Sequence, residues 1–314
     1  MEALKVFSDI KRSKSLLNST YKKFKDSTKF TPVIAIELEF FFIPKNNKTI
    51  TSEEKLEEMT DSISLIAKNH GVTIGNLSRE TGNLQYEINI LHSEDIIAVI
   101  EDILRIKNII SDIASKYNFT ASFDAKPYGD NDVGSGLHVH ISLLNGRGEN
   151  CFVKTNNEEN PILLNSIGGL LLFLPASIPF FVGNPGDFSR YKAKFIIPKE
   201  ELRYRCNATN APINISWGTN NRTTAIRIPD AHQDPASRRI EHRVPACNAN
   251  PYLVITAILF AIEYGITNNV TPQERTWGNA FDEQYHLKTL PLNLNDAIKL
   301  YESSELQKYL SDIK

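Results

Sequence analysis

The chain has 314 residues, of which 41% are hydrophobic and 23% charged, an ordinary composition for a folded globular protein of one large or two medium domains. Its net charge of −2 gives no electrostatic reason to expect nucleic acid or an anionic membrane as a partner. Three cysteines, Cys151, Cys206 and Cys247, are too few and too scattered for a disulfide framework or a thiolate metal site. A reducing cytoplasm is therefore the expected compartment.

The start of the chain, MEALKVFSDIKRSKSLL, lacks the continuous apolar core and small-residue cleavage site of a signal peptide. The longest apolar stretches, around 163–182 and 252–262, are interrupted by Gly, Pro or Glu. A membrane span needs roughly 20 consecutive apolar residues, so we expect both stretches to be buried rather than membrane-embedded.

The first half of the chain shows alternating helical and strand periodicity. In chain order, the pattern predicts a helix over 4–27, a strand over 33–43, a helix over 52–69 capped by Thr51 or Ser52, strands over 72–75 and 84–91, a helix over 93–116, and strands over 120–126 and 136–144.

The second half begins with a long apolar helix over 161–181. The Gly- and Pro-rich stretch 183–212 has no clear period and is predicted to be a long loop, which is typical of a lid or binding element. The pattern then predicts strands over 213–217, 223–229 and 238–244, a buried helix over 250–265 and a final amphipathic helix over 294–312. Because helices and strands do not alternate regularly, an α+β fold with an antiparallel sheet is the expected class.

Acids and histidines fall on one face of several predicted strands, because residues two apart on a strand point the same way. These residues are Glu37 and Glu39 in VIAIELEFFF, Glu87 in LQYEINI, His138 and His140 in GSGLHVHISL, and Glu241 with Arg243 in RRIEHRVP. Carboxylates set into apolar runs are costly unless a cation meets them. The pattern therefore favours a metal site built on a sheet, and an enzyme.

Each of these signals also has a simpler structural interpretation. Glu37 and Glu39 are also compatible with the solvent-exposed face of an edge strand, and Glu80 with a solvent-exposed loop. A histidine such as His138 can be a satisfied core residue, and Glu241 with Arg243 fits a structural ion pair. Only the combination of these segments favours one shared site.

Oxygen-dominated ligation with little nitrogen and no sulfur favours Mg²⁺ or Mn²⁺ over Zn²⁺. Arginines gather in the same region, as expected for a small polyanion site; they are Arg222, Arg227, Arg238, Arg239 and Arg243. Hard cations beside arginines suit the phosphates of ATP. The chain has no GxxxxGK[ST] motif and no GxGxxG motif after a strand, so a nucleotide would be held by the sheet itself.

Several segments together resemble the catalytic domain of glutamine synthetase. They are ELEFFF, YEINI, AKPYGDN followed by GSGLHVHISL, APINISWGTNNRTTAIRIP and RRIEHRVP followed by NANPYL. They occur in the order and roughly the spacing of that family, over about residues 33–310. The resemblance implies a curved antiparallel sheet that forms a funnel flanked by helices. It also implies an ATP- and Mg²⁺- or Mn²⁺-dependent ligase.

The resemblance further implies roles for individual residues. Glu39, Glu80 and Glu87 match the ligands of one metal, and Glu37, His138 and Glu241 match those of a second metal near the phosphates. Nucleotide contacts correspond to His140, Ser142, Arg222, Arg227 and Arg239. Substrate binding corresponds to Gly134, Arg243 and either Lys192 or Arg190, and the catalytic set to Arg239, Arg243 and Asn210.

The chain also departs from the family pattern. Only a helical extension over 1–30 precedes the expected catalytic domain over 31–314, in place of the family's N-terminal β-grasp domain. Asn210 stands where the family has an acid that binds ammonium, and an amide cannot act as a base. Val133 replaces an Asn before GSG.

These features predict an acyl-phosphate-forming ligase that joins a carboxylate, with glutamate expected, to ammonia or a small amine. The alternatives are a γ-glutamyl-polyamine or γ-glutamyl-monoamine synthetase, a regulatory relative that binds nucleotide and metal without catalysis, and a simple phosphotransferase. Because family members form double hexameric rings, we expect either a homo-oligomer or a partner chain that supplies the N-terminal domain.

Overall fold

The computed structural model describes residues 9–46, 49, 51–129, 133–192, 211–231 and 234–313. Its centre is one sheet with the strand order β2-β3-β1-β5-β8-β7-β6, and β4 pairs with β1 outside this path. The strands are β1 (Thr31–Pro44), β2 (Ile74–Arg79), β3 (Gln85–Ser93), β4 (Phe119–Ser122), β5 (Leu137–Leu144), β6 (Trp217–Thr219), β7 (Ile226–Ile228) and β8 (Ile240–His242).

Strand β1 organises the sheet, since it pairs with β3 on one side and with β5 and β4 on the other. Its side chains alternate as the sequence predicts. Ile34, Ile36 and Leu38 are completely buried, whereas Val33 and Glu37 on the other face are partly exposed. One face of β1 therefore belongs to the core and the other is available for a site.

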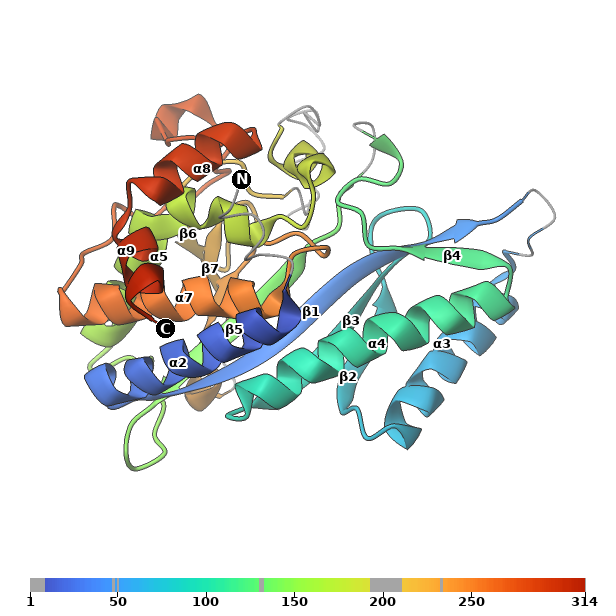
Figure 1. Ribbon diagram of the computed structural model, residues 1–314, viewed down its shortest axis with the longest axis horizontal. Helices are drawn as coiled ribbons and strands as arrows, with labels where there is room; N and C mark the ends of the chain where they lie inside the picture. Colours follow the sequence, from blue (N-terminus) through green and yellow to red (C-terminus); the bar gives the residue numbers. More distant parts are fainter. Residues whose placement is uncertain are drawn as a thin grey trace.

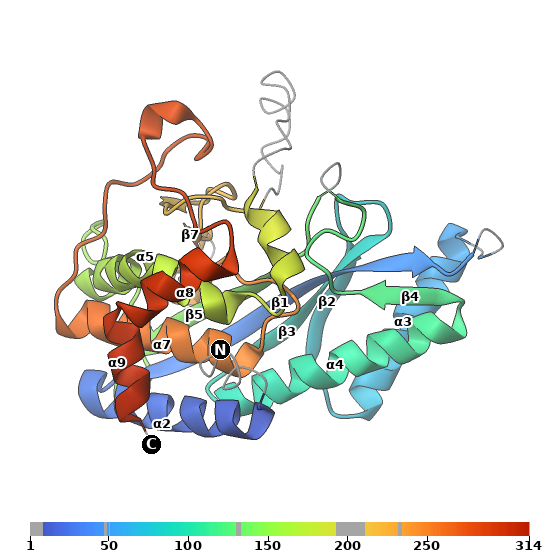
Figure 2. The ribbon, with the colours of Figure 1, turned by 45° about the horizontal axis from the view of Figure 1, so that its top comes forward.

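Helices cover the core side of the sheet. They are α2 (Ile10–Thr28), α3 (Glu53–Asn69), α4 (Ile96–Lys116), α5 (Pro161–Phe181), α7 (Pro251–Thr267), α8 (Leu294–Glu302) and α9 (Glu305–Asp312). Helix α4 packs on β1, β3 and β4, and α3 packs on α4. Helix α2 packs on α7, which in turn packs on α5, as Figures 1 and 2 show.

The expected α+β class is confirmed, but details of the sheet differ. Strands β6 and β7 pair in parallel, whereas we expected every pair to be antiparallel. Strands β6, β7 and β8 have only three residues each, and β2 lies over 74–79 instead of 72–75. Strand β4 ends at Ser122 because Asp124 accepts a hydrogen bond from the Ser122 hydroxyl and the chain leaves the sheet.

The helix boundaries also need corrections. Helix α4 is capped by the Asp95 side chain, so it begins at Ile96 and not at residue 93. The helix predicted over 294–312 is two helices, because Ser304 caps a new helix directly after α8. The predicted loop 183–212 begins with the short 3₁₀ helix η2 (Pro185–Tyr191); residues 193–210 lie outside the described part of the chain.

The long apolar helix predicted over 161–181 is confirmed: α5 is continuous over 21 residues, with Pro175 and Pro179 inside it. By length and composition alone it is long enough to cross a membrane, but 67% of its most apolar window is buried inside the fold. A buried position between α7 and α8 accounts for its apolar surface.

The crossing of α5 and α7 depends on two glycines. A Cβ on Gly169 would overlap the carbonyl oxygen of Ala261, and one on Gly265 would overlap the carbonyl oxygen of Asn165. The two helix backbones therefore approach each other directly.

We expect Gly169→Ala to lower the free energy of unfolding by about 1–3 kcal/mol, because the added methyl group forces the helices apart. Urea denaturation followed by circular dichroism measures the change. Leu172→Ala on the exposed side of the same helix is the control and should change stability far less. Equal stabilities of the two variants would contradict this packing.

Candidate functional site

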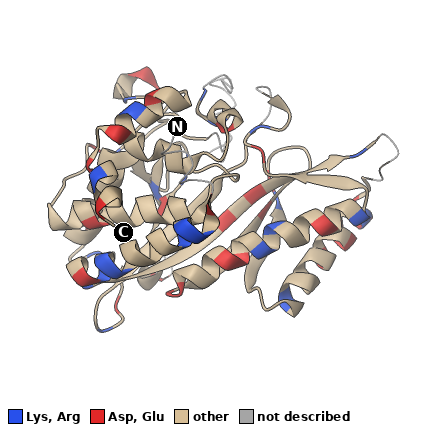
Figure 3. Cartoon of the chain, in the orientation of Figure 1, with Lys and Arg blue, Asp and Glu red and all other residues tan. Residues whose placement is uncertain are grey.

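The predicted acids and histidines meet on the face of the sheet opposite the helical core. Strand pairing sets Glu37 opposite His138 and Glu39 opposite Glu87, while His140 lies opposite Glu241 on the neighbouring pair. Figure 3 shows acidic residues along the middle of β1. Because directly opposed side chains are about 4.5–5.5 Å apart at Cβ, this register alone concentrates their charge.

The donor atoms form two overlapping groups. In one, atoms of Glu37, Glu87 and His138 all lie within 4.8 Å of one another. In the other, atoms of Glu37, His140 and Glu241 do so. This grouping differs from the one expected by resemblance, which placed Glu87 with Glu39 and Glu80 and assigned His140 to the nucleotide. The assignment of single residues to single metals stays a prediction.

Glu39 is held by the glycine turn before β5. Its Oε2 accepts a hydrogen bond of 2.7 Å from the N–H of Gly136, and its own N–H donates to the Gly136 carbonyl at 3.0 Å. Its Oε1 lies 3.8 Å from Nε2 of His138. Glu39 is therefore aimed into the group by the backbone of GSG.

Glu80 lies in the loop after β2 and is half-buried. Burial raises the pKa of its carboxyl, and the negative charge of Glu39 raises it further, whereas Arg222 lowers it. Glu80 therefore lies close enough to Glu39 and Arg222 for both charges to act on it, while its role as a metal ligand stays a prediction.

Arginines stabilise the charge of Glu241, which is buried. Arg227 donates to its Oε2 at 2.6 Å, and Arg243 donates to its Oε1. Although burial opposes ionisation, Arg243 and the neighbouring histidines hold the pKa of the Glu241 carboxyl well below its usual range. This acid is therefore a permanent negative charge.

The other acids repel one another. Burial raises the pKa of Glu87 to about 9, with further contributions from Glu37 and Glu39. At Glu37 burial also opposes ionisation, but His138 and His140 hold the pKa of that carboxyl below its usual value. The charge is therefore distributed unevenly: the histidines favour ionised Glu37, whereas Glu87 lies among carboxylates that oppose its ionisation.

Two histidine nitrogens of this site are among the buried nitrogens that have no hydrogen-bond partner within the described residues. His138 Nδ1 is 3.5 Å from Glu37 Oε2, and His140 Nε2 is 2.9 Å from Glu37 Oε1, but neither contact is aligned as a hydrogen bond. Arg239 Nε donates to the other ring nitrogen of His140 at 3.0 Å, which orients the ring. Unpartnered imidazole nitrogens among mutually repelling carboxylates fit a divalent cation.

A cavity of about 290 Å³ lies beside these groups. Its apolar walls come from Val33, Ala35 and Leu91, and its polar edge comes from His140 and Arg239. Glu37, Asn89, Ile90, His92, Ile141, Ser142, Ala236 and Ser237 complete the lining. An apolar pocket that opens towards an arginine and candidate metal ligands suits a nucleotide base and its phosphates.

Arg190 has a role that the sequence did not indicate. Its guanidinium donates to the carbonyls of Ser135 and, at 3.1 Å, of Arg243, so it braces the glycine turn against β8. Contacts from a side chain to backbone carbonyls leave no sequence pattern. Gly134 belongs to this turn and its carbonyl accepts from Gln85 at 3.1 Å, whereas Lys192 is exposed.

Of the remaining predicted site residues, three lie at the site and one lies outside the described part of the chain. Ser142 borders the cavity, and Arg227 and Arg243 contact the metal-ligand candidates through Glu241. Asn210 lies outside the described residues, so its expected role near the amine stays a prediction.

Comparison with known proteins defines the class. The model of the family "Glutamine synthetase, catalytic domain" matches residues 12–312, and the chain therefore belongs to this family.

Individual relatives are more distant. The chain is 28% identical to gamma-glutamylputrescine synthetase PuuA of Escherichia coli, over 95% of this chain and 64% of that protein. It is 32% identical to glutamate–isopropylamine ligase of a Pseudomonas species, over 76% of this chain and 49% of that protein. The solved GmaS/ADP complex shares the fold, with a TM-score of 0.81 at 24% identity over 96% of this chain and 70% of that structure. The chain thus spans about half to two thirds of these curated relatives.

The raised pKa of Glu87 makes metal binding depend on pH. A carboxyl with a raised pKa is protonated in the metal-free fold between its ordinary value of 4.5 and about 9, so that fold loses stability as the pH rises through this window. A bound cation needs the ionised form. We expect Mn²⁺ binding at pH 7.5 to release a proton and its affinity to rise towards pH 9.

Calorimetric titration in buffers of different ionisation enthalpy counts this proton. Glu87→Gln, which resembles the neutral acid, should leave the metal-free protein as stable at pH 8 and reduce Mn²⁺ affinity at least about tenfold. Glu149→Gln on an exposed turn is the control. A pH-independent affinity in the wild type would be inconsistent with the raised pKa.

Proposed function

We propose that this chain carries the catalytic site of an ATP-dependent carboxylate–amine ligase that joins glutamate to ammonia or a small primary amine. The observation that carries the proposal is the continuity of the acid and histidine groups with the apolar cavity through His140, Glu37 and Arg239. Family membership and the named acceptors of two relatives, putrescine and isopropylamine, support the same reaction class.

The metal-ligand set would be Glu39, Glu80 and Glu87 on the amino-acid side, and Glu37, His138 and Glu241 on the phosphate side. Divalent cations there, Mg²⁺ or Mn²⁺, would neutralise phosphate charge and orient the transferred phosphoryl group. His140 belongs to the second donor group in the structure, so we propose that it borders both the metal and the nucleotide.

The reaction would proceed in two displacements. A carboxylate oxygen of glutamate attacks the γ-phosphorus, and the bond to the bridging oxygen breaks to release ADP. The amine nitrogen then attacks the acyl carbon, phosphate leaves with that oxygen, and the amine loses a proton. Arg239 and Arg243 would stabilise the negative charge that develops on the phosphoryl oxygens.

Arg243 is suited to the reacting centre by its position. It is buried, fixed through Glu241, and its Nε has no hydrogen-bond partner among the described residues. A guanidinium held in this way is organised before the substrate arrives. We propose that Lys192 binds the substrate carboxylate. Arg190 would instead hold the glycine turn in place through its hydrogen bonds to backbone carbonyls.

Compartment and assembly complete the proposal. The described cysteines Cys151 and Cys247 are free thiols, in keeping with a reducing cytoplasm. We propose that further copies of the chain, or a second chain, assemble around this domain; native mass spectrometry of the purified protein tests it.

The test is phosphate release from ATP with glutamate and Mg²⁺ or Mn²⁺, across ammonia, hydroxylamine, methylamine, isopropylamine and putrescine. Release that needs both glutamate and one amine, with amide formed in equal amount, is the expected result. A stable phosphorylated product without amine dependence would indicate a phosphotransferase, and the absence of any glutamate-dependent release would refute the proposal.

We expect Glu87→Gln to reduce this phosphate release at least about a hundredfold while the protein stays folded, since it removes a metal ligand. Glu149→Gln should keep wild-type turnover. If Glu87→Gln retained most of the activity, the acid group would not be the catalytic centre.

Substitutions of Lys192 and Arg190 should change different properties of the protein, the KM for glutamate and the thermal stability respectively. Lys192→Met should raise the KM for glutamate at least about tenfold with little change in the KM for ATP, because it removes a contact to substrate alone. Arg190→Met should instead lower thermal stability, because Ser135 and Arg243 lose a buried donor. The reverse pattern would exchange the two roles.

A further inference from the structure

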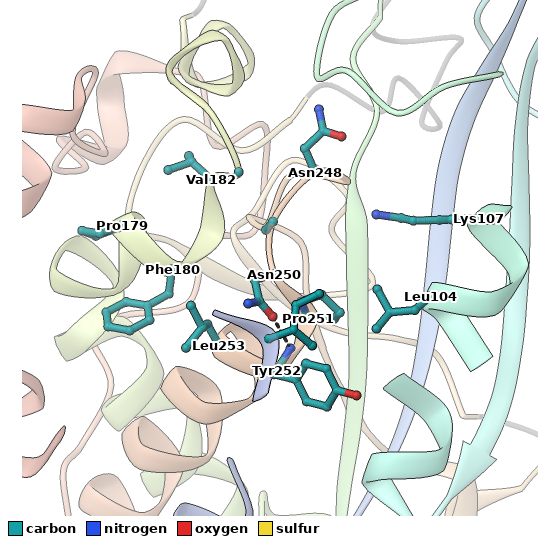
Figure 4. A pocket seen from close by; sticks show the side chains of 13 residues that line it. Leu104, Lys107, Pro179, Phe180, Val182, Asn248, Asn250, Pro251, Tyr252 and Leu253 are labelled. Atoms are coloured by element: carbon teal, nitrogen blue, oxygen red, sulfur yellow. Dashed lines mark hydrogen bonds between the residues drawn. The ribbon is translucent and has the colours of Figure 1, made fainter. Parts of the chain in front are cut away.

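A second cavity lies on the opposite side of the sheet, away from the acids. It has a volume of about 290 Å³ and is enclosed by helix α4, the end of α5, the start of α7 and the first residue of α2 (Figure 4). None of the candidate metal, nucleotide or substrate residues lines it. Its lining consists of Ile10, Leu104, Lys107, Pro179, Phe180, Val182, Gly183, Asn248, Ala249, Asn250, Pro251, Tyr252 and Leu253.

Lys107 supplies a positive charge inside this cavity. Its ammonium group donates to the carbonyl of Cys247 and lies 5.2 Å from the centre of the Phe123 ring. Within the described residues, no carboxylate forms an ion pair with it. Burial lowers the pKa of Lys107, although the more distant Asp187 partly opposes the effect. An ammonium has three donors, so two remain for a ligand.

The start of α7 adds positive potential to the same space. Asn250 caps this 17-residue helix by accepting from the N–H of Tyr252, and Pro251 is its first residue. The N–H groups of this first turn are already used, because the Asn250 side chain accepts from Tyr252 and the Asn250 carbonyl accepts from Leu253 and Val254. The contribution of α7 is therefore the positive end of its dipole and not a free donor. Figure 4 shows the Lys107 side chain pointing towards the middle of the group of lining residues, where Asn250 lies beside Pro251, Tyr252 and Leu253.

The remaining walls are apolar and limit the size of an occupant. Leu104, Pro179, Val182 and Leu253 surround the space between the charged end and the helices. A volume of about 290 Å³ is at the lower end of the roughly 300–1,000 Å³ of small-molecule sites. These walls offer one cation and otherwise mostly apolar contacts, which suits a small ligand with a single charge and an apolar body.

We propose that this cavity binds a small monocarboxylate with a short apolar body, whose carboxylate pairs with Lys107 while its hydrocarbon part contacts Leu104, Val182 and Leu253. The cavity adjoins the back of the catalytic face. Cys247, whose carbonyl Lys107 holds, donates its thiol to the Glu39 carbonyl at 2.9 Å. Gly183 in its wall donates to Asp187 at 2.8 Å, at the start of the helix that carries Arg190.

Hexanoate is a suitable probe, with hexanamide as its uncharged counterpart, in calorimetric and ligand-observed NMR titrations of the full chain without ATP. We expect saturable hexanoate binding, at least about tenfold weaker binding in Lys107→Met, and weaker binding of hexanamide, as expected for a charge-assisted hydrogen bond. Lys116→Met, an exposed lysine on the same helix, should bind hexanoate as the wild type does.

Leu104→Trp keeps the lysine but fills the cavity, so it should also abolish hexanoate binding. If Lys107→Met does not fold, Leu104→Trp alone tests whether hexanoate binds in this cavity. Glu87→Gln should bind hexanoate normally, which separates this site from the proposed catalytic centre. Absence of saturable binding in the wild type, or equal binding by Lys107→Met, Leu104→Trp or hexanamide, would overturn the proposal.

Discussion

The mutual repulsion of carboxyl groups gathered on one face of the sheet, with Glu80 in an adjoining loop, is the constraint to which the rest of the site responds. The register of β1 with β3 and β5 places Glu37, Glu39 and Glu87 side by side, and their negative charges repel one another. The molecule responds in two ways. Arg227 and Arg243 keep Glu241 charged, whereas Glu87 takes up a proton in the metal-free fold.

This division has a consequence for function. Protonation of Glu87 reduces the repulsion, so the site is stable without a cation. A bound cation would stabilise it further, because it would contact the ionised carboxylates and the unpartnered nitrogens of His138 and His140. Rigid backbone supports the arrangement, because Gly136 holds Glu39 and Arg190 holds the glycine turn. Such preorganisation is what phosphoryl transfer requires, since its catalysis consists largely of positioning and charge stabilisation.

Sequence periodicity predicted the features that come from long, regular patterns. The alternation along β1 gave the buried and the polar face, and the long apolar run over 161–181 gave both ends of α5. The convergence of Glu37, His138, His140 and Glu241 also followed from alternation, since each strand contributes one polar face.

Other features have no local signal. Strands β6, β7 and β8 have three residues each, too few to show a period, and their pairing depends on neighbours distant in the chain. The grouping of ligand atoms depends on side-chain rotamers and not on order along the chain. In the structure, Glu87 therefore groups with Glu37 and His138, and not with Glu39 as the sequence suggested. Lys107 and Arg190 bind backbone carbonyls, and a carbonyl carries no residue identity.

The central claim is that the acids and histidines on this face hold divalent cations next to a nucleotide. A crystal structure with Mn²⁺ and a non-hydrolysable ATP analogue, measured at the manganese absorption edge, tests it most directly. The account predicts one anomalous peak within coordination distance of Glu39, Glu80 and Glu87 and another near Glu37, His138 and Glu241. The nucleotide base should lie in the cavity lined by Val33 and Leu91. Manganese bound elsewhere, or a nucleotide outside this cavity, would contradict it.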